Sequence, residues 1–161
     1  MHGYYFEELR EGMEASLSKT ITESDVGQFA GITGDFNPVH VNKEFARQTR
    51  FQDRIAHGML TAGMISAVLG TRLPGPGAIY LSQNLRFRAP VYLGDTVTAT
   101  VRVTDLDAGR SRVSVHTGCF VGGRCVLEGD AVLLVDRRGG EPNLVEPTSR
   151  AGTMPRQGNT E

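Results

Sequence analysis

The chain of 161 residues has the length of one domain and is large enough to bury a hydrophobic core. Its 17 basic and 18 acidic residues give a net charge of −1, which argues against bulk electrostatic attraction to nucleic acid or to a membrane surface. No apolar run approaches the length of a transmembrane helix. The first residues also lack the basic start and apolar centre of a secretory signal, so a cytoplasmic protein is expected.

The N-terminal third is predicted to contain one strand and two short helices. Residues 13–21 alternate apolar and polar side chains, as a half-buried strand does. Thr22 is placed to cap a short helix that Gly31 and Gly34 end. Asn42 is placed to cap a second short helix after an intervening turn.

One long helix and four strands are predicted to follow. From 57 to about 73 the residues are apolar on most sides, which is typical of a buried helix, and a Pro-Gly-Pro-Gly run ends it. Later segments rich in β-branched or aromatic residues, with turn signals between them, are expected to be strands: 79–87, 96–106, 111–121 and 124–135. Four consecutive strands at this spacing favour an antiparallel meander.

These elements predict an α+β fold in which an antiparallel five-stranded sheet wraps around the long helix. A sheet needs its apolar face covered, and a single long apolar helix has the right size to cover it. The domain is expected to span residues 1–138. Residues 139–161 are rich in glycine, proline and polar side chains, and they are predicted to form a flexible C-terminal tail.

The two cysteines flank Gly122-Gly123, which is typical of a two-residue hairpin turn. In that register Cys119 lies opposite Val126, and Cys125 lies opposite Phe120. The two thiols would then point to opposite faces of the sheet, so no disulfide is expected. No metal site is expected either, since no His or Cys pair has ligand spacing.

The segment 34–40 (Gly-Asp-Phe-Asn-Pro-Val-His) carries the candidate chemistry. The residue before Pro38 is pushed towards extended geometry, so a turn can bring Asp35 and His40 to face each other. A water between them would meet both an acceptor and a proton carrier. Taken alone, Asp35 is an ordinary Asx-turn residue and His40 an ordinary structural histidine. Their combination in one motif favours a catalytic dyad.

Residues 29–46 (FAGITGDFNPVHVNKEFA) resemble the hydratase-2 motif of MaoC-like hot-dog proteins. The segments 57–60, 80–87 and 90–95 also resemble this family, and the likeness covers about residues 10–136. It is greatest for the short (R)-specific enoyl-CoA hydratases that supply polyhydroxyalkanoate synthesis from fatty-acid oxidation. The resemblance implies a hot-dog fold and a homodimer. It also implies reversible addition of water to trans-2-enoyl-CoA, with no cofactor other than the coenzyme A of the substrate.

The resemblance also assigns roles to individual residues. Asp35 and His40 match the catalytic dyad, and Gly58 matches the residue whose backbone N–H meets the thioester carbonyl. Ser66 matches a serine that helps to orient the dyad, and Asn37, inside the same motif, is expected to help orient the site.

Periodicity, rather than the motif, places the acyl pocket beside Leu69, with Val132 on a strand opposite. His57 is interpreted mainly as a helix-start residue, and His116 is placed on the exposed side of a strand without a role. Four arginines are candidates for the phosphates of coenzyme A, although a solvated surface position explains each one better when it is taken individually: Arg54, Arg72, Arg86 and Arg88.

Three other functions stay open from the sequence. The first is dehydration of (R)-3-hydroxyacyl groups on acyl carrier protein, although the basic residues are scattered rather than clustered for an acidic carrier. The second is thioester hydrolysis, which hot-dog folds also support. The third is a dimeric acyl-binding protein without chemistry. The presence of both dyad residues argues against the third.

Overall fold

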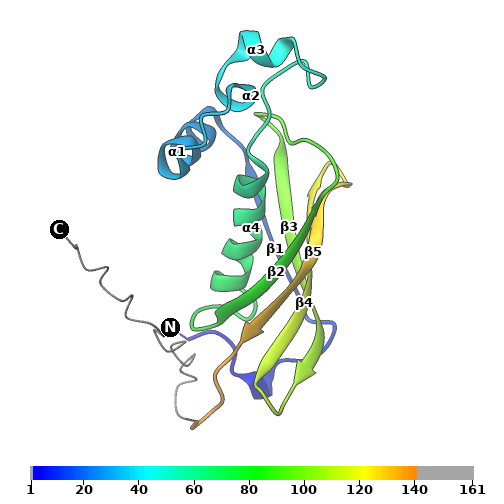
Figure 1. The fold of residues 1–161 in the computed structure, drawn as a ribbon. Helices are drawn as coiled ribbons and strands as arrows, with labels where there is room; N and C mark the ends of the chain where they lie inside the picture. The colour runs from blue at the N-terminus through cyan, green and yellow to red at the C-terminus, as the bar shows by residue number, and fades with distance from the viewer. Residues whose placement is uncertain (1, 141–161) are drawn as a thin grey trace, which may run out of the picture.

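The computed structural model describes residues 2–140, and in it one long helix lies against a curved five-stranded sheet (Figure 1). A short 3₁₀ helix, η1, spans Phe6–Glu8. The strands are β1 Glu14–Thr20, β2 Ile79–Phe87, β3 Thr96–Asp107, β4 Arg112–Val121 and β5 Arg124–Leu134. The helices are α1 Glu23–Thr33, α2 Pro38–Val41, α3 Lys43–Arg47 and α4 Gly58–Thr71. The predicted α+β hot-dog architecture is confirmed. The predicted tail lies, from residue 141 onward, outside the described residues.

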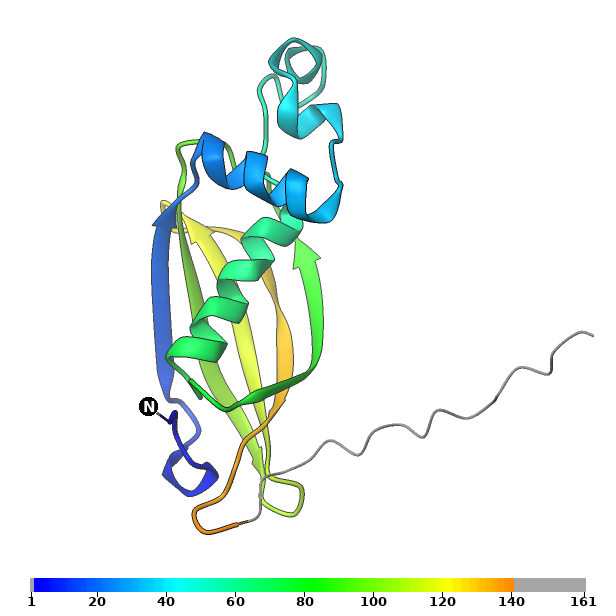
Figure 2. The same ribbon diagram turned by 90° about the vertical axis from the view of Figure 1, so that its left-hand side faces the viewer.

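The strand order is β1-β3-β4-β5-β2, with every neighbouring pair antiparallel. The predicted four-strand meander is therefore wrong for β2, which pairs with β5 at the far edge of the sheet instead of with β3 (Figure 2). The segment between β2 and β3 does not form a hairpin. It pairs instead with the loop before α4, where the Ala56 N–H donates to the Val91 carbonyl at 2.7 Å. This pairing carries the chain across the end of the sheet.

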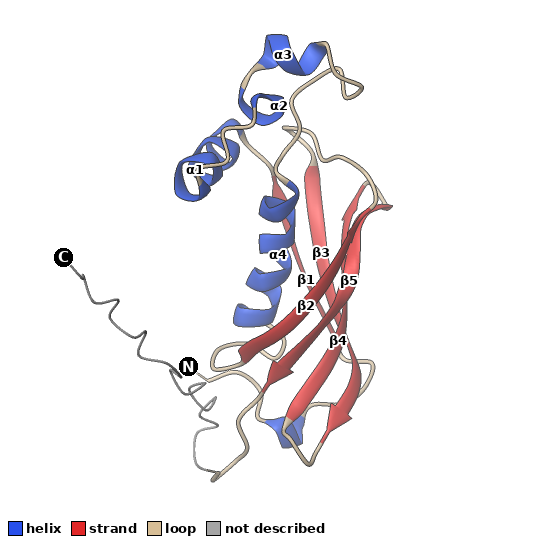
Figure 3. Cartoon of the chain, viewed as in Figure 1, coloured by secondary structure: helices blue, strands red, loops and turns tan. Residues whose placement is uncertain are grey.

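The hydrophobic core lies between α4 and one face of the sheet (Figure 3). Alternate residues of the central strands point to α4, so that Val101, Val115 and Ala131 are almost completely buried. Ile65 and Val68 of α4 are equally buried among them. α4 is about one turn shorter than the predicted 57–73 segment, and His57 is its N-cap. No helix of residues 2–140 is long and apolar enough to cross a membrane.

Three short helices project beyond one end of the sheet, at the N-terminal end of α4 (Figures 1 and 2). α1 begins with a capping box in which the Asp25 N–H donates to the Thr22 hydroxyl and the Thr22 N–H donates to the Asp25 carboxylate. Gly31 lies inside α1 and does not end it, contrary to the prediction. Gly34 alone ends it, with a φ of 77° that favours glycine.

The β4–β5 hairpin turns at Gly122-Gly123 as predicted, but its register differs by one residue on one side. Cys125 lies opposite Phe120 as expected, whereas Cys119 lies opposite Leu127 and not Val126, because a β-bulge intervenes between Cys119 and Phe120. Cys119 is fully buried, Cys125 is half-buried, and both are free thiols.

Candidate active site

Asp35 and His40 lie on either side of the start of α2. Asn37 caps this helix, accepting a hydrogen bond from the Val39 N–H at 3.2 Å, and Pro38 occupies the first helical position. His40 is thereby placed on the buried side of the helix, with 8% of its surface exposed. Asp35 precedes the helix and its Oδ1 accepts the Asn37 N–H at 3.2 Å, which is an Asx turn. Asp35 can therefore be both the residue of an Asx turn and a member of the catalytic dyad.

The hydrogen bonds of His40 determine which ring nitrogen is available for chemistry. Its Nδ1 lies 2.8 Å from the carbonyl oxygen of Ile55. A carbonyl can only accept, so Nδ1 carries the proton of the neutral ring and Nε2 keeps its lone pair. Burial lowers the pKa of His40 below its usual value; the Ile55 hydrogen bond and the charge of Asp35 oppose this effect, and His57 reinforces it. His40 is thus suited to accept a proton at neutral pH.

The expected convergence of Asp35 and His40 is present in the structure. One carboxylate oxygen of Asp35, one ring nitrogen of His40 and one ring nitrogen of His57 all lie within 4.8 Å of one another. A single water can bridge groups at such a separation. The turn at 34–40 therefore produces an acid and an imidazole that share one small space.

Gly58 is the first residue of α4, immediately beside the two side chains. The N–H groups of Leu60 and Thr61 already donate to the His57 carbonyl, at 3.1 and 3.3 Å. The first amides of a helix have no intrahelical acceptor, so the Gly58 N–H is available at the positive end of the helix dipole. A Cβ at this position would lie 2.7 Å from the ring of Phe87, so only glycine fits without displacing that ring.

Two hollows meet at Gly58 and Phe87, which line both of them. One, of about 290 Å³, is bounded by His40 together with the segment 87–91. The other, of about 410 Å³, is bounded by Asp35 and by His57. His40 and Asp35 each line one of these hollows, and Gly58 and Phe87, which line both, mark where the two adjoin.

The other sequence-predicted site residues lie further away. Ser66 is exposed, and it is eight residues beyond Gly58, about 12 Å along the helix axis. It lines a third hollow of about 420 Å³ between α4 and β2, together with Met59, Tyr80 and Gln83. The structure does not bring Ser66 into contact with the dyad within the chain.

Leu69 and Val132 do not form a shared pocket. Leu69 is 2% exposed and belongs to the core between α4 and the sheet. Val132 lies between Ala131 and Leu133, which both belong to that core, so it points to the outer face of the sheet. Val132 therefore does not lie opposite Leu69. The alternation along β5 is present as predicted, but the residues that face α4 are Ala131 and Leu133 and not Val132.

The arginines considered for coenzyme A differ in their surroundings. Arg88 lines the hollow that contains His40, and it forms an ion pair with Glu128. Arg54 makes two hydrogen bonds of 2.6 Å to Glu23. Arg72 donates to the Ser16 carbonyl near the far end of α4. Sequence reasoning missed Arg50, which lines the same hollow as His40 and rests on the Phe51 ring.

Sequence reasoning also underestimated His57. Its side chain is 2% exposed, and its Nε2–H donates to the Asp35 carbonyl at 2.9 Å. Its ring lies 3.9 Å from that of His40, with a tilt of 32°. Its position directly before Gly58 was the available signal, because a residue at the start of α4 must lie at the site.

Asp35, His40 and His57 lie close enough to one another to hold a metal ion, a cluster that the sequence analysis did not expect. His40 Nδ1 and His57 Nε2 already face backbone carbonyls, so each ring has one nitrogen left for a ligand. The two ring centroids lie 3.9 Å apart with a tilt of 32°.

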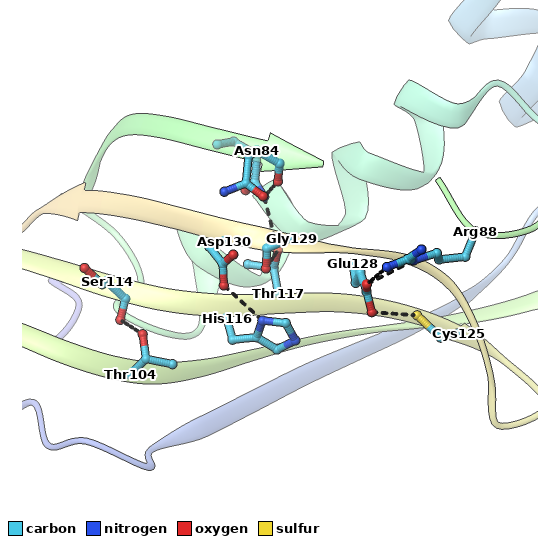
Figure 4. Close-up of polar contacts among 11 residues, drawn as sticks. Asn84, Arg88, Thr104, Ser114, His116, Thr117, Cys125, Glu128, Gly129 and Asp130 are labelled. Carbon is cyan, nitrogen blue, oxygen red and sulfur yellow. Dashed lines mark hydrogen bonds and ion pairs between the residues drawn. The ribbon is translucent and has the colours of Figure 1, made fainter. Parts of the chain in front are cut away.

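A second pairing of histidine with a carboxylate lies on the outer face of the sheet (Figure 4). His116 Nδ1 donates to the Asp130 carboxylate at 3.0 Å, and the two side chains are 54% and 64% exposed. Arg88, Glu128 and Cys125 form a neighbouring polar group. The expected surface position of His116 is confirmed.

The fold and this arrangement define a hot-dog domain with a carboxylate–imidazole site at the N-terminus of its central helix. A family model described as "MaoC like domain" matches residues 6–121, and the chain belongs to this family. The recognition made from the motif is therefore confirmed.

Three related proteins extend this result. An (R)-specific enoyl-CoA hydratase of Rhodospirillum rubrum is 59% identical over 84% of this chain and 94% of its own length. A 3-hydroxybutyryl-CoA dehydratase of Methylorubrum extorquens is 53% identical over 83% of this chain and 85% of its own length. The solved structure of the (R)-hydratase of A. caviae involved in PHA biosynthesis superposes with a TM-score of 0.78. It is 42% identical and covers 80% of this chain and 98% of that one.

Proposed function

We propose that the protein is an (R)-specific enoyl-CoA hydratase, which adds water reversibly to trans-2-enoyl-CoA and gives (R)-3-hydroxyacyl-CoA. The observation that carries the proposal is the free Nε2 lone pair of a neutral His40 beside the Asp35 carboxylate and the N-terminus of α4. The relatives named as hydratase and as dehydratase support the same hydro-lyase reaction in its two directions.

The reaction begins with water held between Asp35 and His40. As the oxygen of this water attacks the β-carbon, the dyad takes its proton. Negative charge then develops on the thioester oxygen, where the Gly58 N–H donates to it. One such donor typically contributes about 3–4 kcal/mol of transition-state stabilisation. The dyad finally returns a proton to the α-carbon from the same side, and the face of the β-carbon that the water attacks fixes the (R) configuration of the product.

The lining of the two hollows supports a thioester lying across Gly58. The His40 hollow also contains Arg50, which pairs with no carboxylate in the described part of the chain and is thus available to the phosphates of coenzyme A. We propose no cofactor beyond the coenzyme A of the substrate. Treatment with a chelator is expected to leave the hydration rate unchanged, because the proposed reaction assigns proton transfer to Asp35 and His40 and the oxyanion contact to Gly58.

We further propose that the protein is a homodimer joined at the β2 edge. β2 pairs with only one strand, β5, and Ile79, Tyr80 and Leu81 along it are more than a third exposed. A free apolar strand edge readily pairs with another chain. Light scattering is expected to give twice the chain mass, and Leu81→Lys is expected to weaken the dimer.

A cytoplasmic location fits the two free thiols and an acyl-CoA substrate.

The product suits the supply of polyhydroxyalkanoate synthesis, because the similar A. caviae (R)-hydratase is a protein involved in PHA biosynthesis. The decisive assay uses crotonyl-CoA and longer enoyl-CoAs, with product chirality measured through stereospecific dehydrogenases. Loss of the enoyl absorbance without release of free thiol separates hydration from thioester hydrolysis. Release of thiol, or an (S) product, contradicts the proposal.

A further inference from the structure

Three parts of the site contact or adjoin one side chain, His57. It donates to the backbone of Asp35, its ring covers the ring of His40, and its carbonyl begins the hydrogen bonding of α4 directly before Gly58. The Phe29 ring of α1 packs on the same imidazole, with ring centroids 4.9 Å apart. The position of His57 therefore influences the proton carrier, the carboxylate and the oxyanion donor together.

Stability alone does not explain a histidine here. The N-cap position favours Ser, Thr, Asp or Asn, whose side chains accept a hydrogen bond from the helix, and His57 makes no such bond. Its Nδ1 is buried and has no hydrogen-bond partner in the described residues. An unsatisfied buried polar atom lowers stability. An apolar side chain of the same shape would satisfy the packing at this position equally well.

We infer that His57 is the positioning residue of the hydration site. Its Nε2–H holds the Asp35 backbone, and its ring fixes the plane of the His40 ring, so that the carboxylate and the free imidazole nitrogen stay at water-bridging distance. This inference rests on the proposed hydratase activity. In this inference His57 acts through Asp35 and His40.

Two substitutions separate the functions of the His57 ring. His57→Phe keeps an aromatic ring on His40 but removes the donor to Asp35, and it also removes the unpaired Nδ1. His57→Gln removes the ring but retains an amide N–H donor at a similar reach. Because misplacement of a reacting group by about 1 Å can cost about 100-fold in rate, His57→Phe is expected to lower kcat by about that factor.

The pattern of effects distinguishes positioning from a structural role. In His57→Phe the KM for crotonyl-CoA and the melting temperature are expected to stay close to wild type, since the aromatic packing is retained and removal of the unpaired Nδ1 offsets the lost hydrogen bond to Asp35. In His57→Gln kcat is expected to recover to within about tenfold of wild type despite the smaller side chain. His116→Gln, on the outer face of the sheet, is the matched control and is expected to leave kcat unchanged.

The experiment measures hydration of crotonyl-CoA by wild type and by the three variants, with thermal unfolding of each. Absence of hydration by the wild-type protein contradicts the proposed function and not this inference. With an active wild type, a kcat of His57→Phe within threefold of wild type overturns the inference. If His57→Phe does not fold, His57→Gln decides. A loss of kcat in it beyond about tenfold, with folding retained, overturns the role of the donor.

Discussion

In the described part of the chain, the pairing of Asp35 with His40 and the pairing of Asp130 with His116 bring the same two chemical groups together, but only the first is a candidate for chemistry. On the outer face of the sheet His116 donates directly to Asp130, both side chains are largely exposed, and each satisfies the other. At the end of α4 His40 is instead held by the Ile55 carbonyl, so its second nitrogen remains free to face Asp35. The comparison shows that proximity of the two groups does not make a site. Burial, a fixed tautomer and a nearby helix N-terminus do.

The largest effects are expected from the dyad itself. Asp35→Asn or His40→Ala removes one of the two groups that handle the proton, and general acid–base catalysis contributes typically about 10²–10⁴-fold. The hydration rate with crotonyl-CoA is expected to fall by at least that range, with an unchanged circular dichroism spectrum. His116→Ala is the matched control at the other pair. Near-normal turnover in either dyad variant contradicts the assignment of the dyad.

A smaller effect is expected from Gly58→Ala. The new methyl group would meet the Phe87 ring at 2.7 Å and push it towards the thioester position, so kcat is expected to fall by about 10–100-fold. Gly70→Ala, near the other end of α4, is the control because a Cβ there meets nothing within 4 Å. It is expected to keep full activity and to gain up to about 1 kcal/mol in stability. Equal kinetics in the two variants would remove Gly58 from the site.

The pH dependence of kcat/KM tests whether His40 is the group that takes the proton from water. Burial, as the largest cause, lowers the pKa of His40 below 6.5, and the mechanism needs this ring neutral. The acid limb of kcat/KM is therefore expected below pH 6.5. The folded state binds this proton less readily than the unfolded state does. The contribution of His40 to stability is thus complete above pH 6.5 and falls as the pH drops below it. An acid limb clearly above 6.5 contradicts His40 as the base.

The sequence predicted the dyad because Asp35 and His40 are fixed by local rules, namely the glycine that ends α1, the Asx turn and the proline at the start of α2. These act over a few residues and can be recognised without the fold. His57 and Phe87 come from other elements, and their contacts with the site depend on how α4 and β2 pack. The strand ranges were predicted to within a residue or two for the same reason as the dyad, since turn signals and alternation are also local.

Pairing in space was harder to predict than local structure. β2 was placed beside β3 because the two are consecutive, but the intervening segment pairs with the loop before α4 and carries the chain to the other edge. Val132 was placed on the inner face because alternation identifies two faces of a strand without stating which one meets the helix. A single β-bulge at Cys119 likewise changed the predicted hairpin register.

The smallest effect is expected from the outer pair, and it completes the comparison. Exposed ion pairs contribute about 0–1 kcal/mol and are weakened by salt, since solvent screens both charges. A double-mutant cycle of His116→Ala and Asp130→Ala is therefore expected to give a coupling free energy within that range at pH 5.5, falling further in high salt. Hydration kinetics of both variants are expected to match wild type. A coupling well above 1 kcal/mol, or a loss of turnover, would mean that the burial of the histidine is not what separates the two pairs, because the pair in which both side chains are exposed would then behave like the pair that contains the buried His40.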